Sequence, residues 1–108
     1  MLILAIDTAL NACSTALLRS GELLVSRTEP MAKGQAERLA PMTRELLAGV
    51  GIRPSQIDRI AVTRGPGAFT GLRIGLAFAR GLAVALDRPC VGVSTLEVLA
   101  HGASALRT

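Results

Sequence analysis

The sequence predicts an α/β fold on a mixed five-stranded sheet, with elements in the order strand, strand, strand, helix, strand, helix, strand, helix. Two observations predict it. Three short strand-like runs follow one another in the N-terminal part, which is typical of an antiparallel meander. The remainder alternates helical spacing with short apolar runs, which is typical of right-handed crossovers between parallel strands. At 108 residues the chain has the length of one domain.

The first three strands are predicted at Leu2–Ile6, Cys13–Leu18 and Leu23–Thr28. Leu2–Ile6 is apolar throughout, as expected of a central strand that is covered on both faces. The polar turn Arg19–Glu22 joins the second strand to the third. Helical spacing then runs from Ala36 to Val50, with the apolar residues on one broad face. These elements form the meander and the first helix.

The second half begins with a β-branched strand, Arg59–Thr63, that leads into a Gly-Pro-Gly loop. A second helix is predicted over Thr70–Leu86, with Thr70 as its N-cap. Cys90–Val93 is the fifth strand. Ser94 and Thr95 then cap a third helix, which fades at His101.

Composition favours a cytoplasmic protein with an aliphatic core. Half of the residues are hydrophobic, and only two are aromatic. The N-terminus lacks the basic region of a signal peptide, and the apolar run that carries Arg80 is too short to span a bilayer. Cys13 and Cys90 each lie in an apolar strand, so we expect buried reduced thiols, with a disulfide or a metal site as the alternative.

The formal net charge is +4, and all of the 12 basic residues except Lys33 are arginine. This charge is compatible with a partner that carries RNA or phosphate. The arginines are scattered singly, however, and no aromatic residues lie between them to stack on bases. An ordinary solvated surface is therefore the simpler interpretation of the charge.

The candidate phosphate-binding residues are Asp7 and Thr8, at the end of the first strand, and the loop glycines Gly65 and Gly67. An acid in such a turn can hold a Mg²⁺-bound phosphate, and a glycine loop before a helix can bring backbone N–H groups to an anion. The turn after Asp7 contains no glycine, and the loop is neither a Walker loop nor a GxGxxG motif. The alternative is that Asp7 and Thr8 tie the turn together.

Small residues recur every four positions along the second predicted helix, at Gly71, Gly75 and Ala79, with Leu72 and Leu76 beside them. Each glycine weakens a helix by about 1 kcal/mol, which is tolerated where another backbone must come close. A second set of small or apolar residues lies round the helix, at Ile74, Ala77, Phe78, Gly81 and Ala85. Because one sheet covers only one face, we expect the glycine face to pack against a second protein. The alternative is that it packs against this domain's own first helix.

The sequence offers no catalytic constellation. His101 is its only histidine, so no histidine pair can form a metal site, and no Ser/His/Asp or Cys/His set is apparent in the sequence. We expect His101 to lie on the surface or at the end of a helix. No catalytic residue and no metal-binding residue is predicted.

Five segments resemble the bacterial TsaB (YeaZ) family. They are LAIDTA at 4–9, CSTAL at 13–17, QAERLAP at 35–41, AVTRGPGAFTGLRIG at 61–75 and VGVSTL at 91–96. The resemblance covers nearly the whole chain, and its GPGAFTGLRIG segment is highly specific to that family. One departure is Gly34-Gln35, where many relatives have a histidine.

The resemblance implies an actin/Hsp70/sugar-kinase type of fold, in which residues 1–108 are the N-terminal ribonuclease H-like lobe and a second lobe is absent from this chain. It implies a non-catalytic scaffold in the complex that forms threonylcarbamoyladenosine next to the anticodon of tRNA. The implied partners are a TsaD-like catalytic protein and a TsaE-like ATPase, or a second copy of the chain in a homodimer. Contact with tRNA is expected only through the complex, with no membrane involved. ATP is assigned to the full complex and no cofactor to this domain.

The first two helices are expected to form the interface with the partner. The residues assigned to it are Leu39, Met42, Leu46, Gly71, Leu72, Arg73, Gly75, Leu76 and Ala79. Two other functions are weighed against this one. The first is a glycoprotease-like metallopeptidase or an ATP-binding phosphotransferase, which only Asp7, Thr8 and the glycine loop support. The second is a module that binds RNA directly.

Overall fold

The computed structural model describes residues 1–9, 12–31, 33–66 and 69–94. It confirms a five-stranded mixed sheet, in the order β3-β2-β1-β4-β5. The elements are β1 (Leu2–Asp7), β2 (Ala12–Arg19), β3 (Glu22–Pro30), α1 (Gln35–Gly49), the short 3-10 helix η1 (Pro54–Gln56), β4 (Arg59–Gly65), α2 (Phe69–Leu86) and β5 (Cys90–Ser94). Beyond Ser94, which ends β5, the predicted third helix lies outside the described residues.

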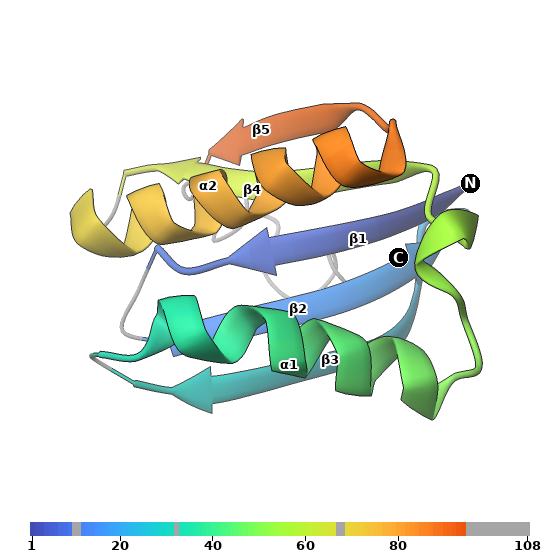
Figure 1. Cartoon of the computed structure of the whole chain (residues 1–108), viewed down its shortest axis with the longest axis horizontal. Helices are drawn as coiled ribbons and strands as arrows, with labels where there is room; N and C mark the ends of the chain where they lie inside the picture. The colour runs from blue at the N-terminus through green and yellow to red at the C-terminus, as the bar shows by residue number, and fades with distance from the viewer. Residues whose placement is uncertain (10–11, 32, 67–68, 95–108) are drawn as a thin grey trace.

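The sheet joins an antiparallel meander to two parallel strands (Figure 1). β1 pairs antiparallel with β2, and β2 pairs antiparallel with β3. Ser20 and Gly21 make the turn between β2 and β3 with φ values of 51° and 84°, and a tight hairpin favours such left-handed conformations. The chain then returns through α1 to β4, which is parallel to β1, and through α2 to β5, which is parallel to β4. This topology is the one that the order of elements predicts.

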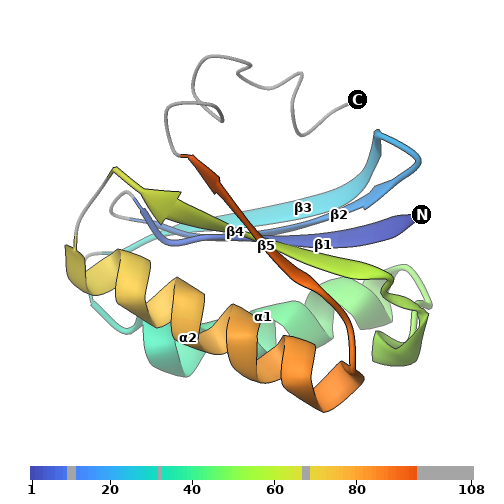
Figure 2. The same ribbon diagram turned by 90° about the horizontal axis from the view of Figure 1, so that it is seen from above.

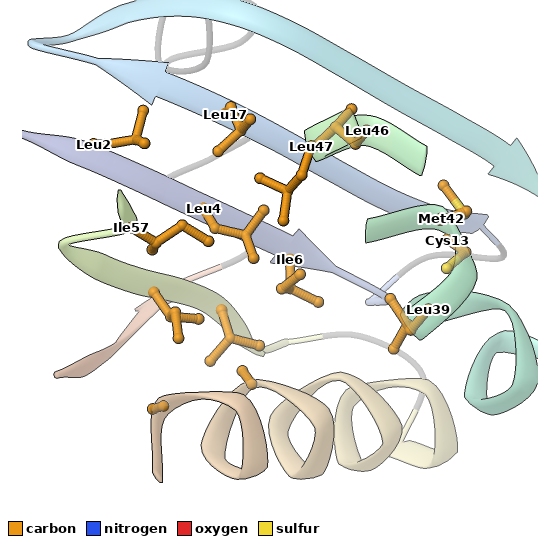
Figure 3. Close-up of a cluster of buried hydrophobic side chains, with 14 residues drawn as sticks. Leu2, Leu4, Ile6, Cys13, Leu17, Leu39, Met42, Leu46, Leu47 and Ile57 are labelled. Atoms are coloured by element: carbon orange, nitrogen blue, oxygen red, sulfur yellow. The ribbon is translucent and has the colours of Figure 1, made fainter. Parts of the chain in front are cut away.

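Both helices lie side by side on one face of the sheet (Figure 2). The core fills the space between this face and the helices, and its side chains are almost all aliphatic (Figure 3). Its fully buried members include Leu4, Ile6 and Leu17 from the sheet and Leu39 and Met42 from α1. Burial of one such side chain contributes roughly 1.5–3 kcal/mol, so this layer is the main source of stability.

The two faces of the sheet are not equivalent. Along β1, Leu2, Leu4 and Ile6 are buried in the core, whereas the alternating residues Ile3 and Ala5 belong to the opposite face and are half-buried. Within residues 1–94, the described helices cover only the first face (Figure 2). The sequence predicted cover on both faces of this strand, and the described elements provide it on one.

Candidate protein-binding groove

The turn after β1 is tied into the fold by Asp7 and Thr8. The Oδ1 atom of Asp7 accepts a hydrogen bond of 2.9 Å from the backbone N–H of Ala9. Thr8 is 2% exposed, and its hydroxyl donates a hydrogen bond of 2.5 Å to the backbone carbonyl of Gly71 in α2. Both side chains therefore have the turn-tying contacts that the sequence left as the alternative to phosphate binding.

Gly71 and Gly75 face this turn of their own chain. A methyl group at Gly71 would overlap the carbonyl oxygen of Thr8, and one at Gly75 would overlap the Thr8 hydroxyl. A methyl group at Gly71 would also lie 3.6 Å from Nε2 of Gln35, the first residue of α1. Thr8 therefore already fills the space beside these two glycines, and their contact with a second protein stays a prediction.

The glycine loop shows the same local packing at its first residue. Gly65 has a φ of 129°, a conformation that only glycine adopts readily. A β-carbon at Gly65 would lie 3.3 Å from Cδ1 of Leu72. Gly67 lies outside the described residues. Structural contacts therefore account for Asp7, Thr8 and Gly65, and phosphate binding stays an untested prediction.

Four other residues predicted for the interface are buried in the domain itself. Leu39, Met42 and Ala79 are 0% exposed, and Leu46 is 2% exposed. The apolar face of α1 packs on the sheet and buries Met42 and Leu46 in the core, and their contact with a partner stays an untested prediction. The same holds for Ala79, which continues the buried glycine face of α2. Leu39 contributes only to the floor of a groove.

This groove lies between α1 and α2 and has a volume of about 530 Å³. It is lined by Ala36, Leu39, Arg73, Ile74, Ala77 and Phe78. Ala36, Arg73 and Ala77 are exposed, whereas Ile74 and Phe78 are half-buried. The groove therefore combines an apolar floor with a rim of small side chains and one cation.

The sequence pattern also contains residues of this groove that lie outside the set predicted for the interface. The second set of residues on α2 contains Ile74, Ala77 and Phe78, which line the groove. Of the residues that were assigned to the interface, Arg73 also lines it, and Leu72 and Leu76 are half-buried on the same helix. The sequence pattern placed Ala36 on the apolar face of the first helix, and the structure shows it exposed at the groove.

A charged cluster lies on the other side of α1, towards β3. Arg38 forms ion pairs with Glu29 at 2.7 Å and with Glu45 at 2.8 Å, and Arg27 forms one with Glu45 at 2.8 Å. Hydrogen bonds from Arg38 lower the pKa of Glu29 and of Glu45 below the usual range. The same bonds raise the pKa of Arg38. Two of the arginines that suggested an RNA partner therefore have acidic partners in the chain.

The two thiols are free, with Cys13 buried and Cys90 half-buried. Burial raises the pKa of both, with a smaller opposing effect of Arg38 on Cys13 and of Arg80 on Cys90. Within the described ranges, no three acidic, histidine or cysteine side chains come together as metal ligands. In the same part of the chain, no helix is both long and apolar enough to cross a bilayer. His101 lies outside the described residues.

Comparison with known proteins adds to this geometry. Residues 29–107 match the family model described as TsaD, tRNA N6-adenosine threonylcarbamoyltransferase. The chain is 44% identical over 103 residues to the tRNA threonylcarbamoyladenosine biosynthesis protein TsaB of Escherichia coli (strain K12), covering 95% of this chain and 44% of that protein. The chain thus spans about half the length of the curated relatives that it matches.

Solved structures agree with the fold. YeaZ from Pseudomonas aeruginosa superimposes with a TM-score of 0.88 at 48% identity, over 94% of this chain and 47% of that chain. RuvC from Thermus thermophilus superimposes with a TM-score of 0.63 at 12% identity, over 93% of this chain and 68% of that chain. The likeness to RuvC concerns the fold alone, and together these structures support the predicted ribonuclease H-like lobe.

Proposed function

This chain belongs to the family described as TsaD, tRNA N6-adenosine threonylcarbamoyltransferase, and within it resembles the TsaB (YeaZ) proteins; from this premise we propose that it is the N-terminal lobe of a non-catalytic scaffold subunit in tRNA threonylcarbamoyladenosine biosynthesis. The groove between α1 and α2 binds a TsaD-like catalytic protein. A TsaE-like ATPase and tRNA join through the resulting complex, in the cytoplasm. The resemblance that the sequence predicts is thereby confirmed, and the role in the complex is the proposal.

The observation that carries the proposal is the composition of the groove. Ala36 and Ala77 on its rim are small and exposed, so the backbone of another helix can come close. Leu39, Ile74 and Phe78 give it an apolar floor, on which a helix buries its own apolar face. These features suit a helix of another protein better than a small polar substrate.

The matched family model favours a partner of related architecture. A protein with the same fold presents an equivalent pair of helices, and two such pairs can pack about a pseudo-twofold axis as a four-helix bundle. A second copy of the chain fits by the same symmetry. We therefore expect a homodimer when the TsaD-like protein is absent, and competition between the two assemblies when it is present.

Ala77→Glu tests the proposal, because it places a charge on an apolar groove without disturbing a buried residue. We expect affinity for a purified TsaD-like protein, measured by isothermal titration calorimetry, to fall by roughly tenfold or more. Ser26→Glu is the control, since Ser26 is exposed on β3 and lies outside the groove. Equal binding by Ala77→Glu and the unchanged chain would show that the groove is not the interface.

A further inference from the structure

Thr8 lies where the first turns of both helices meet the end of β1. Its hydroxyl donates to the carbonyl of Gly71 at 2.5 Å. The absence of a side chain at Gly71 and at Gly75 lets α2 pack directly on the backbone and the hydroxyl of Thr8. Gln35, the buried first residue of α1, approaches the same point on α2.

The contacts of Thr8 and Gln35 influence the width of the groove because α1 and α2, which form its walls, move as rigid helices. Ile74 and Phe78 form the α2 wall of the groove, and they follow Gly71 by one and two turns of the same helix. The distance at which the first turn of α2 packs on Thr8 therefore determines the position of this wall. Ala36 follows Gln35 directly on the opposite wall. The turn that carries Thr8 is itself held by the hydrogen bond from Ala9 to Asp7.

We infer that Thr8 is a positioning residue that sets the spacing of α1 and α2 and thereby the fit of a partner helix in the groove between them. The inference rests on the proposed function for its consequence on binding, but the spacing can be measured without a partner. Thr8 is fully buried and contacts α2, so it acts through the position of Ile74 and Phe78 and not by touching the partner.

The informative variant is Thr8→Val, which replaces the hydroxyl by a methyl group of similar size. A methyl carbon next to a carbonyl oxygen needs about 3.3–3.6 Å, so α2 must move outward from the turn. We expect affinity for the TsaD-like protein to fall about fivefold or more at a temperature at which the variant is folded. Thr8→Ser keeps the hydroxyl and should restore the original affinity. A merely structural role would lower the melting temperature of Thr8→Val and leave its affinity unchanged.

A second measurement separates this inference from the proposed function. Spin labels at Glu37→Cys on α1 and Ala77→Cys on α2, in a Cys90→Ser background, report the spacing of the helices by EPR without any partner. We expect Thr8→Val to lengthen or broaden the distance distribution and Thr8→Ser to leave it unchanged. An unchanged distribution in Thr8→Val overturns the inference. Failure of the unsubstituted chain to bind the TsaD-like protein overturns the proposed function, and the label distance then still decides the role of Thr8.

Discussion

Arg38 on α1 holds Glu29 on β3 through two parallel hydrogen bonds, from Nε to Oε1 and from Nη2 to Oε2, each 2.7 Å long. The same guanidinium donates from Nη1 to Glu45 at 2.8 Å. This geometry ties the outer side of α1 to the edge strand β3, whereas the groove lies on the side of α1 towards α2. The position of α1 thus depends on a charged contact at one side and on apolar packing beneath it.

Arg38→Gln removes this contact and should lower the melting temperature at low salt. The loss should shrink near about 1 M NaCl, because salt screens exposed ion pairs. Arg44→Gln is the matched control, since Arg44 is an exposed arginine of the same helix that makes none of these bonds. Thermal unfolding followed by circular dichroism measures the difference, and equal effects of the two substitutions would contradict the prediction.

The same cluster predicts a dependence of stability on pH. The pKa values of Glu29 and Glu45 are lowered in the folded chain, so their contribution is present above the unfolded value of about 4.3 and is lost as pH falls through the folded values. Melting temperature should therefore decline as pH drops below about 4.3. The decline should be smaller in Arg38→Gln, and a parallel decline in both proteins would assign it to other carboxylates.

Three glycines of α2 provide an internal comparison. Gly71→Ala should destabilise the chain by about 2 kcal/mol or more, because the new methyl overlaps the Thr8 carbonyl, which cannot rotate away. Gly75→Ala should cost less, since the group it meets is a side chain. Gly81 has open space around its α-carbon, so Gly81→Ala should stabilise the helix by about 1 kcal/mol. Denaturant unfolding ranks the three variants, and a Gly81→Ala variant that is no more stable than the other two argues against the contacts with Thr8.

Leu39 tests how far a residue of the groove floor contributes to the core of the isolated chain. Because it is 0% exposed, Leu39→Ala should lower the free energy of unfolding of the isolated chain by about 3 kcal/mol. Val84, which is 83% exposed on α2, should change stability by less than about 0.5 kcal/mol when it is replaced by alanine. Urea unfolding of the two variants without any partner tests this. If Leu39→Ala left the free energy of unfolding of the isolated chain unchanged, Leu39 would not be a core residue.

The sequence was sufficient to predict the sheet and its topology. The hydrophobic periodicity and the turn residues between the apolar runs identify all five strands and the first two helices. The rules for meanders and right-handed crossovers then leave one arrangement. The bounds shifted by one or two residues where residues typical of turns, such as Asp7 and Pro30, extend a strand.

The orientation of α2 could not be predicted in the same way. Both of its faces consist of small or apolar residues, so periodicity gives no preference between Gly75 and Ala77 as the inward position. The inward face of α2 is determined by its contact with the turn that carries Thr8. Thr8 and Gly71, which form this contact, are 63 positions apart in the sequence, so local periodicity does not predict it. The sequence therefore predicts α2 as an interface helix, whereas the structure places its glycines against Thr8 and its groove-lining residues on another side of the helix.

Because Gly71 and Gly75 are buried, the glycine pattern of α2 gives limited information when related chains are identified in genome sequences. A search for these glycines selects chains in which a helix contacts the turn after the first strand. Such chains share this helix–turn contact, whichever partner they bind. The rim residues Ala36 and Ala77 are free of that constraint and can vary as partners vary. Assignment of related chains to particular complexes should therefore compare the rim of the groove, because the glycine signature groups them by architecture.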